Sequence, residues 1–528
     1  MVSIILDSNS TIASSCCQTY LTVNVLHWPL TSKSCVVFYE PLTHWYYQGV
    51  CVVHEMMSSV LQLVNILYIP KRMFGSWRQM KRVGVCQSTG IQMAGSHIRH
   101  FHSTPHTSAE ITAPQPSTTK TIKQVIEDLT RKVGAAKSFT HVIDRSSLLK
   151  LIPQSPDELP PRRMMDSWDS AIIPLGSEER LREKYVTFMG GVRVGRLLED
   201  LDVFAVWLCY KHISNPRQTA DLPSPYSIVT ALVDRIDFDQ GATLRPDQDI
   251  RMSGHVSWTG KTSLETIIKI EQLADGVWKQ VTRAVFVMVA RDPLNQGSAP
   301  VNPLVCETSK EKEIFHAGEV NKLQRKLIDA ESLFKIPPNE SEKTLVHQLF
   351  MGLTNPKERS FAFKSRPDNS VCMKDTKLKN LIICHPESRN IFNKIFGGFL
   401  MRKAFEMSWA TAFVVSKQRP RVLHIDDILF RSPVEIGSLL YLNSQVVYTE
   451  GQHMQISTKA SVVDVVTGST NLTNIFHFTY EVDQPVPTTI PETYHEAMMY
   501  LDGRRHYQLV RGMRKFYGQG ENPADTPI

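Results

Sequence analysis

The sequence predicts an α+β protein made of two similar units, each an antiparallel sheet wrapped around one long helix. Two segments show the same order of features, and they begin at Val192 (VRVGRLLEDLDVFAVWLCYKH) and at Asn393 (NKIFGGFLMRKAFEMSWATAF). In each segment glycine stands near the start, and apolar residues then recur at helical spacing. A strand-rich stretch follows each helix, so the pattern indicates a duplicated fold.

The two predicted helices carry apolar stripes that we expect to lie in the core. Such a stripe is the side of an amphipathic helix that packs against another layer. The stripes consist of Leu197, Leu198, Leu201, Ala205 and Leu208 in the first helix and of Leu400, Ala404, Phe405 and Trp409 in the second.

The strands after the two helices repeat as well. Apolar and polar residues alternate in the first unit, which predicts a half-buried strand with one apolar face, formed by Ile250, Met252, Val256 and Trp258. Val446 and Tyr448 take the places of Val256 and Trp258 in the second unit. Hairpin turns are predicted directly afterwards, at Thr259-Gly260 and Glu450-Gly451.

Equal spacing supports the duplication. Phe286 lies 28 residues after Trp258, and Phe476 lies 28 residues after Tyr448. A single unit would leave one sheet edge unpaired, whereas joining two edges across a pseudo-two-fold axis removes that liability. We therefore expect both helices at one interface, with a composite site there.

Net positive charge and cysteine are concentrated before residue 109. Residues 1–108 hold seven Lys/Arg against three Asp/Glu, whereas the other 420 residues hold 52 against 49. A nearly neutral body lacks the basic surface that tracks phosphates, so we expect no nucleic-acid partner. Only Cys209, Cys306, Cys372 and Cys384 fall in the body, which predicts a reduced protein. No apolar run is long enough for a stable membrane span.

The N-terminal segment has the composition of a mitochondrial transit peptide. From Met56 to Ala109 there is no acidic residue, while Lys and Arg recur and Ser and Thr are plentiful. The stretch from Arg99 to Thr104 resembles a two-step matrix-processing site. We expect cleavage between about Phe101 and Ala109 and a mature protein in the mitochondrial matrix. Either translation begins at Met73 or the 72 residues before it have a role of their own.

Three other patterns are set aside. Gly254 to Thr262 imitates a phosphate-binding loop, but five residues separate its glycines, and the segment falls in a predicted strand and turn. Cys384 and His385 are adjacent in an extended segment and so point to opposite faces. His255 lies in an alternating strand, which favours a structural role. We expect no metal site and no cofactor.

The segment from Asn390 to Gly398 (NIFNKIFGG) resembles the N-x-x-G-x-x-x-G-G opening of hot-dog acyl-CoA thioesterases, with Asn393 in place of the first glycine. The wider blocks ICHPESRNIFNKIFGGFLMRKAFEMSWATA, GRLLEDLD, ALVDRID, SGHVSWTGKTS, FVMVARD and YLDGRRHY resemble the mitochondrial acyl-CoA thioesterase 9 group, over about Leu175 to Tyr507. The resemblance implies tandem hot-dog domains.

The resemblance also divides the chain. It implies hot-dog domain 1 at 173–305 and hot-dog domain 2 at 366–490. Around them we expect an N-terminal extension with the transit segment at 1–108, a helical or irregular lead-in at 109–172, a charged helical linker at 306–365 and a C-terminal tail at 491–528. The charge run of the linker is interpreted as a solvated helix face.

In such tandem enzymes the implied site joins an Asn from one unit with a carboxylate on the helix of the other. Seven positions after Gly195 stands Asp202, whereas seven after Gly398 stands Phe405. Eight positions before Gly398 stands Asn390, whereas eight before Gly195 stands Thr187. Each unit thus lacks one half of the pair. The resemblance implies one complete site, Asp202 with Asn390, and an inactive mirror-related site.

These residue types suit hydrolysis of a thioester. A carboxylate held near an amide can activate water as a general base. Backbone N–H groups at the start of the second helix, at Gly397, Gly398 and Phe399, are suited to bind the carbonyl oxygen as it gains charge. Glu406 is a possible substitute base. We expect hydrolysis of fatty acyl-CoA to fatty acid and CoA by a homo-oligomer; the alternative is a non-catalytic hot-dog protein that binds acyl-CoA or CoA.

Overall fold

The computed structural model describes residues 120–134, 144–219, 221–238, 244–274, 276–355, 357, 360–363, 366–390, 393–464 and 467–512. The predicted transit segment and its processing site lie outside the described residues, as does the end of the C-terminal tail. Among the helices that are described, none combines the length and the apolar character that a bilayer crossing needs.

The first unit wraps four antiparallel strands around helix α5 (Val194–His212). The strands are β4 (Ser227–Phe238), β5 (Ile250–Thr259), β6 (Ser263–Ala274) and β7 (Val277–Arg291). The predicted stripe of α5 is buried, with Leu197, Leu201 and Leu208 almost inaccessible to solvent. Lys211 lies in its last turn, where positive charge complements the helix dipole. Burial lowers the pKa of the neighbouring His212 to about 4, so its imidazole is neutral.

The second unit repeats this plan around helix α8 (Gly397–Ser416). Its strands are β13 (Arg421–Phe430), β14 (Leu439–Glu450), β15 (His453–Val463) and β16 (Thr470–Glu481), with β12 (Leu378–Ile383) added at the edge beside β14. The helix ends where Lys417 takes a left-handed conformation with φ 57°.

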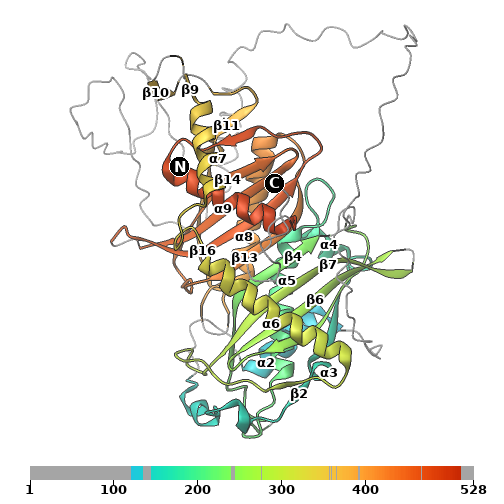
Figure 1. The fold of residues 1–528 in the computed structure, drawn as a ribbon. Helices are drawn as coiled ribbons and strands as arrows, with labels where there is room; N and C mark the ends of the chain where they lie inside the picture. The colour runs from blue at the N-terminus through green and yellow to red at the C-terminus, as the bar shows by residue number, and fades with distance from the viewer. Residues whose placement is uncertain are drawn as a thin grey trace, which may run out of the picture. The chain divides into compact units, whose positions relative to one another are not determined.

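Both units share one eleven-stranded sheet in the order β1-β3-β5-β6-β7-β4-β13-β16-β15-β14-β12, in which β1 is Lys120–Thr121 and β3 is Asp169–Ile173. At its centre β4 and β13 pair antiparallel, with Ile236 opposite Ile425. Two edges are therefore joined, as the sequence predicts, and α5 packs against α8 beside the seam. Figure 1 shows the green first unit and the orange second unit as one continuous sheet.

Matching bulges confirm the duplication and correct one detail of it. The register of β5 shifts between Val256 and Trp258, and that of β14 shifts between Val446 and Tyr448. A bulge places one extra residue on its strand and so reverses which face the following side chains occupy. The alternation predicted that Trp258 lies on the same face as Val256, and this prediction is wrong. Trp258 points to the opposite face of the sheet.

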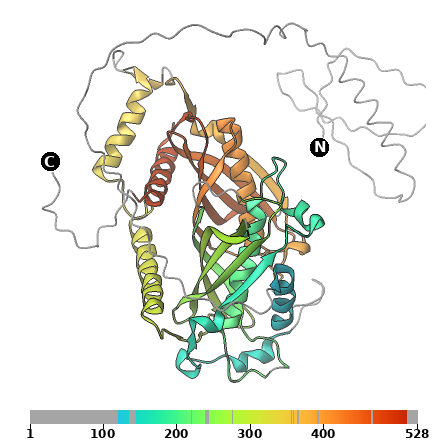
Figure 2. The ribbon, with the colours of Figure 1, turned by 90° about the vertical axis from the view of Figure 1, so that its right-hand side faces the viewer.

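A second layer of helices covers that opposite face. Helix α6 (Ser309–Ala330) crosses β5, and helix α9 (Tyr494–Val510) crosses β14. A Cβ on Gly318 would lie 2.5 Å from Trp258, and one on Gly503 would lie 2.5 Å from Val447, so each helix needs glycine at its closest approach. Figure 2 shows α6 and α9 on one side of the sheet and α2 and α8 on the other.

The charged face of α6 is not simply solvated. Trp258 Nε1 donates to Glu319 at 2.5 Å, and Arg325 lies 3.1 Å from Asp234 and 3.4 Å from Glu265. The residues predicted as a linker thus hold a helix that is ion-paired to the sheet of the first unit. Helix α7 (Glu340–Gly352) follows and is joined to α9 by a two-pronged ion pair between Glu342 and Arg505.

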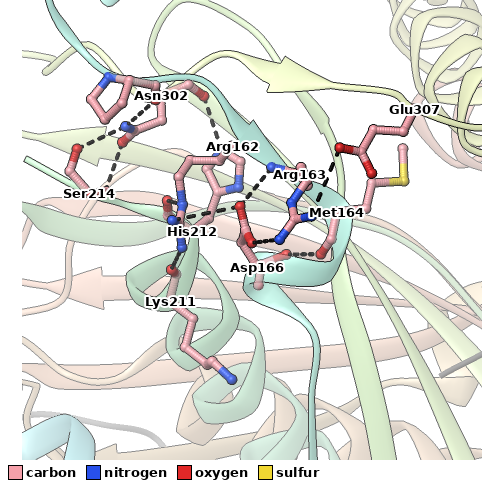
Figure 3. Close-up of polar contacts among 11 residues, drawn as sticks. Arg162, Arg163, Met164, Asp166, Lys211, His212, Ser214, Asn302 and Glu307 are labelled. Carbon is pink, nitrogen blue, oxygen red and sulfur yellow. Dashed lines mark hydrogen bonds and ion pairs between the residues drawn. The ribbon is translucent and has the colours of Figure 1, made fainter. Parts of the chain in front are cut away.

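The lead-in is tied to the end of α5. Arg162 donates to the carbonyl oxygens of His212 at 3.1 Å and Lys211 at 3.3 Å, as Figure 3 shows. A helix end leaves such carbonyls without intrahelical partners, so the guanidinium caps α5. Asn302 in turn accepts from the backbone N–H of Ser214.

Helix α2 (Ile122–Val133) packs on the side of α5 and ends at Gly134, which has φ 67°. The remaining elements are β1 (Lys120–Thr121), η1 (Ser146–Leu151), η2 (Pro156–Glu158), β2 (Arg162–Arg163), α3 (Met164–Ser167), β3 (Asp169–Ile173), α4 (Glu179–Tyr185), β8 (Leu304–Val305), β9 (Thr354–Asn355), β10 (Ser360–Phe363), β11 (Ser370–Cys372), η4 (Met373–Thr376), η5 (Pro386–Ser388) and β17 (Thr488–Ile490).

Candidate active site

Asp202 reaches from α5 to the first turn of α8. Its carboxylate Oδ2 accepts the backbone N–H of Gly398 at 2.7 Å, and its Oδ1 accepts the hydroxyl of Thr230 at 2.5 Å. The side chain is 0% exposed. Burial raises the pKa of Asp202 to about 6, and the bonds from Thr230 and Gly398 only partly offset this. The group is thus a desolvated carboxylate held between the two units.

The two glycines that begin α8 allow this approach. A Cβ on Gly397 would lie 3.1 Å from Asp202 Oδ2, and a Cβ on Gly398 would lie 2.8 Å from the Cα of Glu199. Any larger residue at Gly398 would push the helices apart. The sequence motif therefore reflects a contact between backbones, which only glycine permits.

Asn390 lies at the entry to α8, in a tight turn closed by its own side chain. Its backbone N–H donates to the carbonyl of Lys394 at 2.6 Å, and its Oδ1 accepts the N–H of Lys394 at 3.1 Å. Asn393 has φ 54°, the left-handed conformation that the motif normally assigns to glycine. The turn predicted before the helix is thus formed with Asn in this position.

The mirror-related turn in the first unit is built alike. Thr187 donates its N–H to the carbonyl of Gly191 at 2.8 Å, and its hydroxyl accepts the N–H of Gly191 at 3.0 Å. Gly190, with φ 77°, matches Asn393. Thr187 therefore stands in the place of Asn390, as the count from the glycines predicts, but it carries no amide.

The mirror-related carboxylate position is filled by an aromatic cluster. Phe405 is buried, with its ring 5.9 Å from that of Phe478 and 6.2 Å from that of Tyr480. A Cβ on Gly195 would lie 3.4 Å from the Phe405 ring, so the glycine that faces Asp202 in one half faces an apolar ring in the other. This half offers no carboxylate at the interface position.

Glu406, the possible substitute base, is held in ion pairs. Arg193 lies 2.7 Å from its carboxylate, Arg402 lies 3.1 Å away and Lys403 lies 3.8 Å away. Burial would raise its pKa, but the hydrogen bonds from Arg193 and Arg402 outweigh it and hold the pKa of Glu406 below its ordinary value. These contacts favour a structural anion over a proton acceptor.

A cavity of about 1120 Å³ opens on the side of the interface that holds Asn390. Thr230, Asn390, Gly397 and Phe399 all line it, whereas Thr187 and Phe405 do not. One part of the wall is apolar and comes from α2, α5 and β4, with Ile126, Leu129, Val133, Val203, Val206 and Ile228. Another part is basic, with Arg196, Arg291, Arg389, Lys394, Arg402, Lys403 and Arg431.

Thr230 is a site residue that sequence reasoning missed. It lies on β4, lines the cavity and donates to Asp202, so it connects the buried carboxylate to the open space. The block ALVDRID begins at the next residue, but it did not mark Thr230 itself, because only the placement of β4 around α5 brings Thr230 to Asp202. A second finding concerns Gly398, whose N–H is directed at Asp202. Of the three backbone N–H groups predicted to bind the carbonyl oxygen, those of Gly397 and Phe399 do not donate to Asp202.

The other sequence patterns lie away from this cavity. Gly254 is explained by packing, since a Cβ there would lie 2.4 Å from the carbonyl of Ile267 and 3.0 Å from Leu208. Cys384 is buried, and burial raises its pKa to about 11, so it is not a ready thiolate. Burial lowers the pKa of His255, whose Nδ1 lies 3.1 Å from the carbonyl of Val256. Its role is structural.

The chain has two helices, each wrapped by a sheet, and the two sheets are joined along one seam. A buried carboxylate on one helix contacts the glycines that begin the other. These features define the class of tandem hot-dog enzymes. The chain matches no protein-family model. It is 46% identical to human "Acyl-coenzyme A thioesterase 9, mitochondrial" over 403 residues, which cover 75% of this chain and 91% of the relative. The chain belongs to the mitochondrial acyl-coenzyme A thioesterase 9 family.

Two further relatives are also named acyl-coenzyme A thioesterases. Mouse "Acyl-coenzyme A thioesterase 10, mitochondrial" is 46% identical over 70% of this chain and 83% of its own length. The hop (Humulus lupulus) "Acyl-coenzyme A thioesterase 4, mitochondrial" is 31% identical over 66% of this chain and 68% of its own length. A solved acyl-CoA hydrolase from Staphylococcus aureus, 20% identical, aligns with 27% of this chain and 91% of its own at a TM-score of 0.27.

Proposed function

We propose that this acyl-CoA thioesterase hydrolyses its substrate at one composite site, built from Asp202 of the first unit and Asn390 and the start of α8 of the second. The observation that carries the proposal is the buried carboxylate of Asp202, held between Gly398 and Thr230 beside the large cavity. The mirror-related half has Phe405 and Thr187 at the same places. We therefore assign thioester hydrolysis to one site in each chain.

Asp202 acts as the general base. A carboxylate has about four acceptor positions, and the bonds from Gly398 and Thr230 occupy two of them. Water entering beside Thr230 donates to a remaining lone pair and attacks the carbonyl carbon of the thioester. Asp202 takes the proton, the C–S bond breaks, and the proton passes to the departing CoA thiolate. A carboxylate with a pKa of about 6 is ionised at neutral pH and still basic enough for this transfer.

The developing negative charge falls on the carbonyl oxygen. The first N–H groups of a helix have no intrahelical acceptor, and the helix dipole favours negative charge there. Gly398 donates to Asp202, so we assign the oxygen to the N–H of Gly397 or Phe399, with the Asn390 amide beside them. Preorganised donors of this kind contribute roughly 10²–10³-fold to the rate.

The cavity wall suggests how the substrate lies. Val203, Val206 and Tyr210 follow one another along α5 beyond Asp202, and α2 covers the same region. Tyr210 lies roughly 12 Å along the helix from Asp202 at 1.5 Å per residue. We assign the acyl chain to this apolar part. The seven Lys and Arg of the lining exceed its three acidic residues, Glu199, Asp200 and Glu387, and so suit the phosphates of CoA.

A turnover assay tests the proposal. Released CoA is measured with a thiol-reactive dye against a series of saturated acyl-CoA lengths, for the natural chain and for Asp202→Asn. We expect thioester cleavage by the natural chain and a loss of about 10²-fold or more in the variant. Equal turnover by both would remove Asp202 from the mechanism. Binding of acyl-CoA without turnover by either would instead favour the non-catalytic binding protein.

Localisation in the mitochondrial matrix is part of the proposal, since the relatives are named mitochondrial and the first 108 residues have transit-like composition. Mass spectrometry of the endogenous protein should find a mature N-terminus between about Phe101 and Ala109. An intact Met1 would contradict this.

We also propose that the chain forms homo-oligomers. Strand β12 ends the sheet, and its Leu381 and Ile383 are each 54% exposed, which is unusual for an unprotected edge. Light scattering during size exclusion should give a mass above 59.9 kDa, and a monomer would refute the assignment.

A further inference from the structure

A small cavity lies between helix α9 and the sheet of the second unit, on the face opposite to the thioesterase cavity. Its volume is about 80 Å³. A single water needs only about 10–15 Å³, so this space has room for a group of several heavy atoms. Met499 of α9 closes one side, and the rest of the wall is polar. The polar side chains are Lys377, Asn443, Gln445, Ser457, Lys459 and His495.

The matching place in the first unit can be found by comparing the two outer helices. Helix α6 begins after the N-cap residue Thr308, and helix α9 begins after the N-cap residue Thr493. In both helices the glycine of closest approach to the sheet stands ten residues after the cap. Counted from the caps in this way, Met499 of α9 corresponds to Ile314 of α6.

The strand registers and the segments before the sheets give two further correspondences. The bulges of β5 and β14 follow the pairs made by Thr266 and Ile456, so the next residues, Ile267 and Ser457, are equivalent. Ser167 accepts a backbone N–H from β5 at 2.9 Å, and Thr376 accepts the equivalent N–H from β14 at 3.1 Å. The residues that follow them, Trp168 and Lys377, are therefore equivalent as well.

The first unit fills this space with apolar side chains. Ile267 and Ile314 pack with Met164 in one buried apolar cluster. The second unit has Ser457 in place of Ile267, and Lys377 in place of a tryptophan. The cavity is therefore a feature of the second unit alone, and the substitutions that line it are toward polar and basic side chains.

Two ammonium groups face this cavity. Burial lowers the pKa of Lys459, the charge of Asp502 partly offsets this effect, and the charge of Lys377 adds to it. Glu496 lies 3.9 Å from Lys377, and among the described residues no carboxylate lies within ion-pair distance of Lys459. His495 belongs to the first turn of α9, where the helix dipole also favours negative charge. A bound anion would relieve the repulsion between the two lysines.

One atom of the wall needs a hydrogen-bond donor. Asn443 Oδ1 is buried and has no hydrogen-bond partner among the described residues, and such an atom costs free energy. Hydrogen phosphate satisfies both requirements, because one of its oxygens carries a proton and the others accept. Sulfate has no proton at neutral pH, and a phosphate monoester loses its last one above about pH 6. The wall thus matches the free hydrogen phosphate ion better than these other anions.

We propose that this cavity binds one inorganic hydrogen phosphate ion, with Lys377 and Lys459 donating to its oxygens and Asn443 accepting its proton. Ser457 contributes a hydroxyl group beside the ion. The ion would connect β14, β15 and α9, and so hold the outer helix against the sheet. The site is separate from the thioesterase cavity and involves none of the proposed catalytic residues.

Calorimetric titration of the full chain with inorganic phosphate tests the proposal. Sulfate and glycerol phosphate are titrated in the same way at about pH 7.5, where both lack the proton of hydrogen phosphate. The variants are Lys459→Gln, which removes one ammonium group, and Asn443→Leu, which removes the acceptor. The matched control is Lys269→Gln, because Lys269 is the equivalent of Lys459 on β6 of the first unit. Circular dichroism checks that each variant folds.

We expect the natural chain and the Lys269→Gln control to bind one more phosphate per chain than Lys459→Gln, or to bind it about 10-fold or more tightly. Comparing the variant with the control also removes the contribution of any phosphate bound at the basic wall of the thioesterase cavity. The natural chain should prefer phosphate about 10-fold or more over sulfate and glycerol phosphate, and Asn443→Leu should lose this preference.

Three results would overturn the proposal. The first is absence of phosphate binding by the natural chain. The second is equal phosphate stoichiometry and affinity in Lys459→Gln and Lys269→Gln. The third is a natural chain that binds sulfate or glycerol phosphate as tightly as it binds phosphate, because the acceptor on Asn443 would then play no part in recognition.

Discussion

Replacing Asp202 with asparagine removes a buried negative charge and keeps the shape of the side chain. The introduced amide has an oxygen that can accept the N–H of Gly398 and an NH₂ group that can donate to the hydroxyl oxygen of Thr230, so both contacts of the natural carboxylate can persist. The change therefore tests the charge itself, with little disturbance of packing.

The expected magnitude follows from the pKa of Asp202. Burial raises it from 3.8 to about 6, a shift of roughly two units, and each unit corresponds to about 1.4 kcal/mol. Because the folded-state pKa lies above the unfolded one, the contribution of this group to stability is complete below about pH 4 and is lost as pH rises through about 6. At pH 7 the ionised carboxylate thus lowers the free energy of unfolding by about 3 kcal/mol, relative to the protonated form.

The Asp202→Asn variant should therefore be more stable than the natural chain at pH 7, by up to about 3 kcal/mol, while losing about 10²-fold or more of kcat/KM. Urea unfolding at pH 7 and near pH 4 measures the first effect, and the stability difference should shrink at the lower pH. In the natural chain kcat/KM should fall about tenfold per unit below pH 6. A variant that is less stable at pH 7, or a pH profile without a change near 6, would refute the desolvated base.

Two further substitutions test the surroundings of Asp202. Thr230→Val removes a hydrogen bond that lowers the pKa of Asp202, so kcat/KM should fall about 10-fold or more and its pH midpoint should move above 6; an unchanged midpoint would rule out this role. Leu129→Trp narrows the apolar part of the cavity, so kcat/KM should fall for the longest acyl chains and stay the same for the shortest. The control is Leu323→Trp, a change at an exposed residue of α6, which should leave the dependence of kcat/KM on acyl-chain length unaltered. The same loss at every length would place the acyl chain elsewhere.

The sequence was sufficient for the parts of the structure that depend on repetition. The glycine-started helices, the matching strands and the joined edges follow from patterns that recur at fixed spacing. The pairing of Asp202 with the start of α8 followed from the family resemblance and a count of positions. The structure adds the reason, which is the close approach of Gly397 and Gly398 to α5.

What the sequence did not indicate depends on contacts between distant segments. Thr230 meets Asp202 only because β4 curves around α5, and the block ALVDRID that begins at the next residue did not mark Thr230 itself. Trp258 changes face because of a bulge, which a strict two-residue alternation does not reveal. The charges of α6 seemed suited to solvent, yet Arg325 is matched by Asp234 and Glu265 on the sheet. In each case tertiary packing decides the outcome.

The central claim, one working site shared between the units, is tested most directly by kcat/KM in a double-mutant cycle. Asp202→Asn and Asn390→Ala should each reduce kcat/KM about 10²-fold or more, and the double variant should lose little further, because residues that act as a unit are not additive. Glu406→Gln and Thr187→Ala, at or beside the mirror-related positions, should keep most activity. If Glu406→Gln abolishes turnover while Asp202→Asn is nearly neutral, the working site lies in the other half of the interface.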